Sequence, residues 1–255
     1  MFKPIFTIAR YTFREAVRNN LFLLAILGMI CFFGLTEFIG ELAITESATL
    51  QAMLIAGSLR IFAVLTISLF VIVSMVREFN DKGVEFLMSL PVARHNYLFG
   101  KLLGFIILAL VISVLAGILL MIYSDIGNVI VWSISLFCEL GLVVSLSIFC
   151  LLTFNNITLA YILVLAFYFL SRSISAIQLI SASPIIQSEG AAQEFINSLV
   201  NVIAYVLPGL HEFTRSEWLA YGARWEGLVP VIIQSIVYLG LLISASLFDL
   251  YRKEL

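Results

Sequence analysis

Long apolar runs, separated by short polar segments, dominate this chain of 255 residues. A helix needs about 20 consecutive apolar residues to cross the hydrocarbon core of a bilayer. Six runs meet that length, at residues 21–39, 52–76, 98–123, 128–152, 158–180 and 228–250. They are apolar on every side, unlike the alternating strands of a membrane β-barrel. The pattern predicts an all-α polytopic membrane protein with six transmembrane helices in one transmembrane domain, residues 1–255.

Composition points to the same class. Hydrophobic residues make up 62% of the chain and charged residues 12%, which leaves too few polar groups to cover a soluble domain. The apolar runs occupy most of the sequence, so we expect neither a separate catalytic domain nor a nucleic-acid partner. Residues 1–20 precede a run that is too long for a signal peptide and lacks a small-residue cleavage site, so we expect an uncleaved first span.

Lysine and arginine gather in the segments before the first span, between the second and third, and after the sixth. They are Lys3, Arg10, Arg14, Arg18, Arg77, Lys82, Arg94, Lys101, Arg252 and Lys253. On the other side only Arg215 and Arg224 lie outside the apolar runs. Basic residues favour the cytoplasmic side of short loops. We therefore expect both termini in the cytoplasm and the chain in the plasma membrane, which in bacteria is the inner membrane.

The first 20 residues have the pattern of an amphipathic helix. Arg10, Arg14 and Arg18 recur at a spacing of four. The opposite face carries Ile5, Ile8, Ala9, Phe13, Ala16 and Val17. This predicts a helix in the cytoplasmic membrane interface, with its arginines near anionic lipid head groups. An ordinary positively charged flank would account for the arginines but not for the helical spacing of the apolar residues.

The strongly charged segment 77–97 lies between the second and third spans. Turn residues 80–83 and Pro91 bound a stretch, 84–90, that can make barely two helical turns. So short a helix is marginal in water. Its apolar side chains, which include Phe86 and Leu87, are unfavourable to expose, so the stretch is expected to dock against another protein or the membrane surface.

Residues of this segment resemble a pattern found after the second span in permease subunits of type-2 ATP-binding-cassette exporters. The matching positions are Glu78, Gly83, Glu85, Leu87, Leu90-Pro91-Val92, Arg94 and Gly100-Lys101. The amphipathic N-terminal segment and the number of spans are also similar to that family, so the resemblance covers the whole chain. Val84 replaces the threonine that is usual in the family.

The resemblance implies that residues 84–90 form a coupling helix seated in a groove of a separate cytoplasmic ATPase subunit. Two copies of that ATPase bind ATP and Mg and pair with two permeases, the second being another copy of this chain or a homologue. The ATPase-coupling residues are then Glu78, Gly83, Val84, Glu85, Phe86, Leu87, Leu90, Pro91 and Arg94. This chain itself has no phosphate-binding loop, since His95 and Leu102 replace a glycine and the hydroxyl residue that such a loop requires. We expect no cofactor, no metal site and no catalytic residue in this chain.

Three charges fall inside predicted spans, where an unpaired ionisable group costs several kcal/mol. At about 1.5 Å per residue, Arg60 and Arg172 lie about 12 Å from the outer end of their spans and Glu139 about 16 Å. These depths permit a bridge from Glu139 to either arginine. Such a bridge would lock the bundle, or the charges would line a translocation path.

The segment 181–227 is too polar for another span and too apolar for a free loop. Phe195, Leu199, Val202 and Val206 share one helical face. Pro208-Gly209 ends that helix, and Thr214 with Glu217 fits a capping box for a second one. Trp218, Tyr221 and Trp225 suit the membrane–water interface on the non-cytoplasmic side. We expect two short re-entrant or interfacial helices against spans five and six. In the family that the chain resembles, such helices help to gate the exit, whereas the aromatic pattern alone predicts an anchor.

An export permease is the function that these patterns favour. A transporter driven by an ion gradient is the first alternative, but it would need paired carboxylates near the midplane, and only Glu139 fits. The second alternative is an ATPase-coupled mechanotransmission or scaffold subunit that moves no solute.

Overall fold

The computed structural model describes residues 2–42, 48–80, 93–154, 156–182, 191–215, 217–222 and 225–252. Within these ranges the chain is helical and contains no strand, which agrees with the predicted all-α class. The helices are α1 (Phe2–Arg18), α2 (Asn20–Leu42), α3 (Ala48–Asn80), α5 (Arg94–Leu120), α6 (Ile126–Phe154), α7 (Ile157–Ala182), α8 (Ala191–Val206), α9 (Leu210–Phe213), α10 (Glu217–Tyr221), the 3-10 turn η1 (Trp225–Gly227) and α11 (Leu228–Arg252).

Five of the described helices are long and apolar enough to cross a membrane. They are Ala52–Asn80, Arg94–Leu120, Ile126–Phe154, Ile157–Ser181 and Trp225–Arg252. These helices match predicted spans two to six and fit an integral membrane protein. Predicted span one falls within α2, which is not among these five helices, and the six-span layout stays a prediction.

Polar residues mark where the helices stop and start. The backbone N–H of Thr158 donates to Asn156 Oδ1 at 3.0 Å, so Asn156 caps the start of α7. Asp125 directly precedes α6, and its carbonyl accepts the N–H of Val129. Helix α8 ends at Val206, two residues before Pro208, as the sequence predicts.

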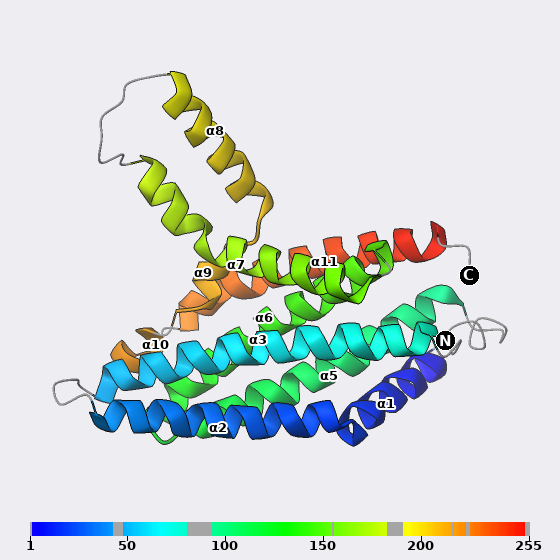
Figure 1. Ribbon diagram of the computed structural model, residues 1–255, viewed down its shortest axis with the longest axis horizontal. Helices are drawn as coiled ribbons and strands as arrows, with labels where there is room; N and C mark the ends of the chain where they lie inside the picture. Colours follow the sequence, from blue (N-terminus) through cyan, green and yellow to red (C-terminus); the bar gives the residue numbers. More distant parts are fainter. Residues whose placement is uncertain are drawn as a thin grey trace.

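Helix α6 forms the centre of the molecule (Figure 1). It packs against α3, α5, α7 and α11, and its side chains are buried along most of its length. A helix that is apolar on all sides can be covered on all sides by other helices. The core therefore surrounds α6, which carries Glu139 at its middle.

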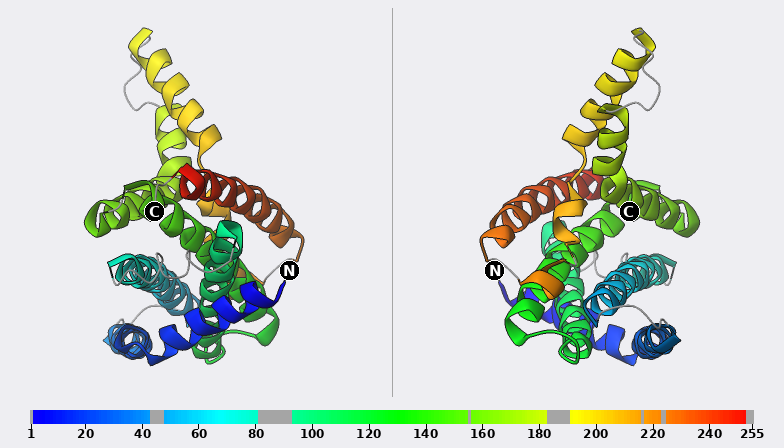
Figure 2. Two further views of the ribbon diagram at one scale, coloured as in Figure 1. Left: turned by 90° about the vertical axis from the view of Figure 1, so that its right-hand side faces the viewer. Right: turned by 90° about the vertical axis from the view of Figure 1, so that its left-hand side faces the viewer.

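Both termini lie at one end of the bundle, together with the end of α3 and the start of α5 (Figure 1). The flanks of the predicted coupling helix thus share an end with the N-terminal helix. The last part of α7 lies beside α8, and this pair projects from the bundle (Figure 2).

Candidate functional site

A buried ion pair joins the second and fourth predicted spans. Arg60 Nη1 on α3 lies 2.6 Å from Glu139 Oε2 on α6, and both side chains are fully buried. The pairing expected from their similar depths is therefore present. Because each charge would be unfavourable alone in this apolar core, the contact fixes α3 against α6.

Hydrogen bonds extend the pair into a network. The Tyr168 hydroxyl on α7 donates to Glu139 Oε1 at 2.8 Å, and Arg172 Nη1 donates to the Tyr168 oxygen at 2.9 Å. Arg172, the other predicted partner of Glu139, therefore reaches it through Tyr168. Both carboxylate oxygens of Glu139 are engaged, so its side chain is held in place by partners on α3 and α7.

The outer segment also contacts this network through its backbone. Arg60 Nη1 donates to the carbonyl oxygen of Phe213 at 2.7 Å, and the Ser135 hydroxyl donates to the same oxygen. Phe213 ends the one-turn helix α9, where carbonyl groups lack partners within the helix. Arg60 thus links the bundle interior to residues between the fifth and sixth predicted spans.

The network is incomplete on one side of Arg60. Among the described residues, Arg60 Nε and Nη2 and Trp132 Nε1 are buried and make no hydrogen bond. The guanidinium carbon of Arg60 lies 4.9 Å from the centre of the Trp132 ring, which provides a cation–π contact. A buried donor without a partner costs about 1–3 kcal/mol. The Nη1 atom of Arg60 therefore has two hydrogen-bond acceptors, whereas Nε and Nη2 have none. The guanidinium group is also stabilised by its contact with the Trp132 ring.

A second charged cluster lies at the end of the bundle that holds the termini. Lys101 Nζ on α5 is 2.6 Å from Glu78 Oε2 on α3 and 3.7 Å from Glu15 Oε2 on α1. The Tyr97 hydroxyl donates to Glu78 at 3.2 Å, and the Ser74 hydroxyl donates to Glu15 at 2.9 Å. This charged cluster, namely Glu15, Ser74, Glu78, Tyr97 and Lys101, ties three helices together.

Glu78 and Lys101 belong to the family-like pattern and stand on opposite sides of the segment 81–92. Gly83, Val84, Glu85, Phe86, Leu87, Leu90 and Pro91 lie outside the described residues. Beyond that segment, Arg94 Nη1 donates to the carbonyl oxygen of Leu250 on α11 at 3.3 Å. The end of α3 and the start of α5, which flank the predicted coupling helix, are therefore bound to each other and to α1 and α11.

Residues Phe2–Arg18 form helix α1, on which Arg10, Arg14 and Arg18 are exposed, and its place in the membrane interface stays a prediction. Its buried stripe packs against α5, which the amphipathic pattern alone did not predict. A Cβ atom added at Gly100 would lie 2.7 Å from Ile8 Cβ, and one at Gly104 would lie 2.7 Å from Thr12 Cβ. Gly100 and Gly104 thus let α1 approach the backbone of α5 closely.

In the described part of the chain, α8 packs beside α7, the fifth predicted span, and protein does not cover its apolar face. Phe195 is 68% exposed and Val206 67%, and Leu199 and Val202 are exposed as well. The side of α8 toward α7 carries polar groups instead, and Gln178 Nε2 on α7 donates to Asn201 Oδ1 at 3.3 Å. In a membrane a polar helix pair with an apolar exterior is favourable, because lipid covers apolar side chains as well as protein does.

Two expectations for the outer segment need correction. Trp218 is only 7% exposed and lies against Gly227, while Trp225 is 60% exposed. Trp218 is therefore a packing residue, whereas Trp225 has the exposure expected of a membrane anchor. The Thr214 hydroxyl donates to the His211 carbonyl oxygen at 3.4 Å, and α10 starts at Glu217 itself, so Thr214 does not cap that helix.

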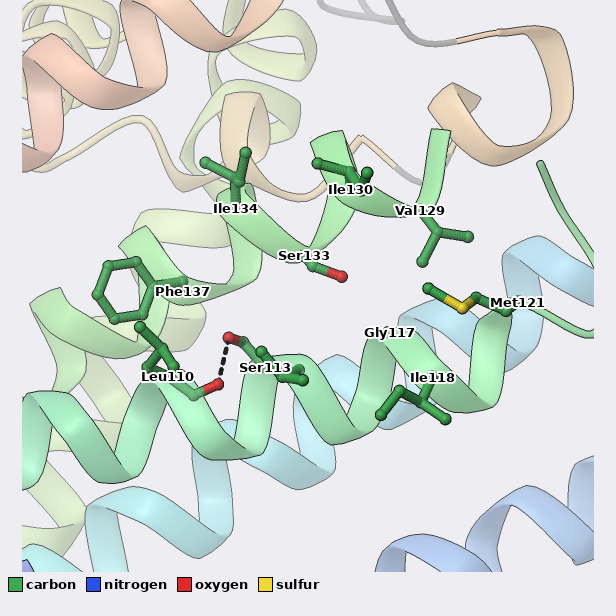
Figure 3. A pocket seen from close by; sticks show the side chains of 11 residues that line it. Leu110, Ser113, Gly117, Ile118, Met121, Val129, Ile130, Ser133, Ile134 and Phe137 are labelled. Carbon is green, nitrogen blue, oxygen red and sulfur yellow. Dashed lines mark hydrogen bonds between the residues drawn. The ribbon is translucent and has the colours of Figure 1, made fainter. Parts of the chain in front are cut away.

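An apolar pocket of about 370 Å³ lies between α5 and α6 (Figure 3). Leu110, Ile118 and Phe137 are among its lining residues, and its only hydroxyl groups belong to Ser113 and Ser133. The Ser113 hydroxyl already donates to the Leu110 carbonyl oxygen at 2.9 Å. The pocket offers apolar contact and no charge. Within the described ranges no three His, Cys, Asp or Glu side chains come close enough to hold a metal ion.

No protein-family model matches the chain, and no curated protein does so either.

Proposed function

We propose that this chain is the membrane-spanning subunit of an ATP-binding-cassette transporter of the export type. A separate cytoplasmic ATPase, in two copies, binds ATP and Mg and docks on the helix expected at residues 84–90. The observation that carries the proposal is the 2.6 Å ion pair between Lys101 and Glu78. These residues of the family-like pattern join the two helices that lead into and out of the proposed docking segment.

A segment that receives mechanical force needs rigid flanks. Lys101 is nearly buried, and an ion pair so protected is weakly screened by salt. It connects α3 to α5, and Glu15 adds α1 to the same cluster. A push on residues 84–90 would therefore move these helices as one body instead of bending a loose connection.

Helix α3 offers a route from the docking segment to the buried network. Glu78 and Arg60 both lie on α3, eighteen residues apart, which is about 27 Å along a helix. A tilt of α3 would change the contact of Arg60 with Glu139 and with the Phe213 carbonyl oxygen. In the proposed cycle this network holds the outer segment closed until the ATPase moves α3.

The proposed complex has six spans in this chain, with α2 as the first, and a second permease subunit beside it. Both termini and the flanks of segment 81–92 lie at one end of the bundle (Figure 1). Most lysines and arginines outside the apolar runs gather at that end, which supports a cytoplasmic location for it. The plasma membrane is the proposed location.

Reconstitution tests this proposal. The full chain, purified with the subunits that remain bound to it, is placed in lipid vesicles, and ATP hydrolysis and solute movement are measured. The proposal predicts vanadate-sensitive hydrolysis from a bound ATPase, and a Lys101→Met variant that loses solute movement while hydrolysis continues. Arg252→Gln, an exposed change at the same end of the bundle, is the control. Transport driven by an ion gradient without ATP would contradict the proposal, and hydrolysis without solute movement would favour a mechanotransmission subunit.

A further inference from the structure

A basic pocket lies where α1 meets the end of α3. It has a volume of about 460 Å³ and is lined by Tyr11, Arg14, Glu15, Arg18, Asn19 and Arg77. Two of its arginines come from α1, and the third comes from α3, far away in the sequence. Three guanidinium groups and one carboxylate give this lining a net positive charge.

Its arginines are available to a ligand. Arg14, Arg18 and Arg77 are exposed, and none of them makes an ion pair or hydrogen bond within the described part of the chain. The carboxylate of Glu15 is already engaged, by Lys101 at 3.7 Å and by the Ser74 hydroxyl at 2.9 Å. The pocket thus presents three uncommitted planar donors, which suit the oxygens of a phosphate group.

An apolar cavity follows the basic pocket along α3, the helix that lines both. This cavity, of about 270 Å³, is lined by Leu24, Phe62, Leu65, Thr66, Leu69, Phe70 and Tyr161. Leu69 is eight residues before Arg77 on α3, so the two cavities are separated by about 12 Å along that helix, and Leu24 reaches the apolar cavity from α2, which follows α1. A phosphate site followed by an apolar cavity at that depth matches the order of groups in a phospholipid.

We propose that Arg14, Arg18 and Arg77 bind the phosphate head group of an anionic phospholipid, whose acyl chain lies along α2 and α3. The site is at the end of the bundle where the termini lie, at the junction of α1 with the apolar helix α2. Head groups stand at this level of a bilayer, whereas a soluble phosphate would gain nothing from the apolar cavity. The bound lipid bridges α1 and α3 beside the charged cluster of Glu15, Glu78 and Lys101. This inference is independent of the proposed transport function.

Lipid titration of the purified full chain tests the site. After delipidation in detergent, binding of phosphatidylglycerol and of phosphatidylcholine is measured by native mass spectrometry. Phosphatidylglycerol is expected to bind at least about tenfold more tightly, and each arginine to account for about fivefold in affinity. Arg18→Gln/Arg77→Gln should therefore weaken phosphatidylglycerol binding about 25-fold. The control Arg10→Gln/Arg252→Gln removes the same charge from exposed positions outside the pocket and should change affinity less than about twofold.

Three outcomes would overturn the proposal. Equal losses in the two double variants would show a general surface-charge effect. Equal binding of phosphatidylcholine would show that the arginines do not select an anionic head group. Displacement of phosphatidylglycerol by excess inorganic phosphate or glycerol 3-phosphate would show a site for a soluble phosphate instead of a lipid.

Discussion

Arg60 on α3 and Glu139 on α6 form a 2.6 Å ion pair in the interior of the bundle, with no side-chain surface exposed on either residue. The same Arg60 nitrogen donates to the Phe213 carbonyl oxygen, so one guanidinium connects two spanning helices and the outer segment. From this contact we predict how replacing Arg60 or Glu139 changes the stability of the protein.

Glu139→Gln should destabilise the protein by about 3–5 kcal/mol, because it leaves the charge of Arg60 buried without a counter-charge. Arg60→Met/Glu139→Gln should be milder than the sum of the single changes, since it removes the stranded charge as well. Thermal unfolding in detergent measures both. Ser147→Ala serves as the control, because the Ser147 hydroxyl is buried but bonds only within its own helix, to the Val143 carbonyl oxygen. A Glu139→Gln variant as stable as that control would show that the pair contributes nothing.

Tyr168→Phe should destabilise the protein by about 1.5–3 kcal/mol, because it removes a hydrogen bond to a charged carboxylate. It should also make Arg172→Gln almost neutral, since Arg172 reaches Glu139 only through the Tyr168 hydroxyl. Tyr161→Phe is the matched control, as its hydroxyl lies 3.4 Å from the Leu65 carbonyl oxygen and contacts no charged group of the network. The chain of contacts would be disproved if Arg172→Gln were equally harmful in both backgrounds.

Gly104→Val should separate α1 from α5, because a Cβ atom there would lie 2.7 Å from Thr12 Cβ and 3.0 Å from the Ala9 carbonyl oxygen. Overpacking of this kind costs about 1–3 kcal/mol. Gly141 on α6 has no atom within 4 Å of an added Cβ, so Gly141→Ala should be neutral or stabilising by up to about 1 kcal/mol. Thermal unfolding gives the stabilities, and cross-linking between cysteines introduced at positions 5 and 103 reports the α1–α5 contact. Retained cross-linking in Gly104→Val would contradict the close approach.

Sequence alone predicted the features that depend on long patterns. The runs that became α3, α5, α6, α7 and α11 are apolar on all sides over more than about 20 residues, a signal that few other structures produce. The depths of the three charges along their helices were enough to predict that Glu139 pairs with Arg60 or Arg172, but not to choose between the two arginines. Tyr168 was overlooked, although its spacing of four from Arg172 on one helix could have indicated the link.

Other contacts had no signal in the sequence. The Phe213 oxygen belongs to the backbone, so no residue type marks it as the partner of Arg60. The apolar face of α8 was identified from its period, but periodicity cannot tell whether lipid or protein covers a face. Trp218 was assigned to the membrane interface by residue type, and the structure shows that its ring packs against Gly227 instead.

ATPase coupling through residues 84–90 is the central claim, and paired measurements of ATP hydrolysis and solute movement in vesicles test it most directly. Glu85→Ala/Phe86→Ala should weaken ATPase binding, and in complexes that do assemble it should abolish solute movement while hydrolysis continues. Arg10→Gln, on the exposed face of α1, should leave both unchanged. Normal assembly with fully coupled transport in the Glu85→Ala/Phe86→Ala variant would contradict the account.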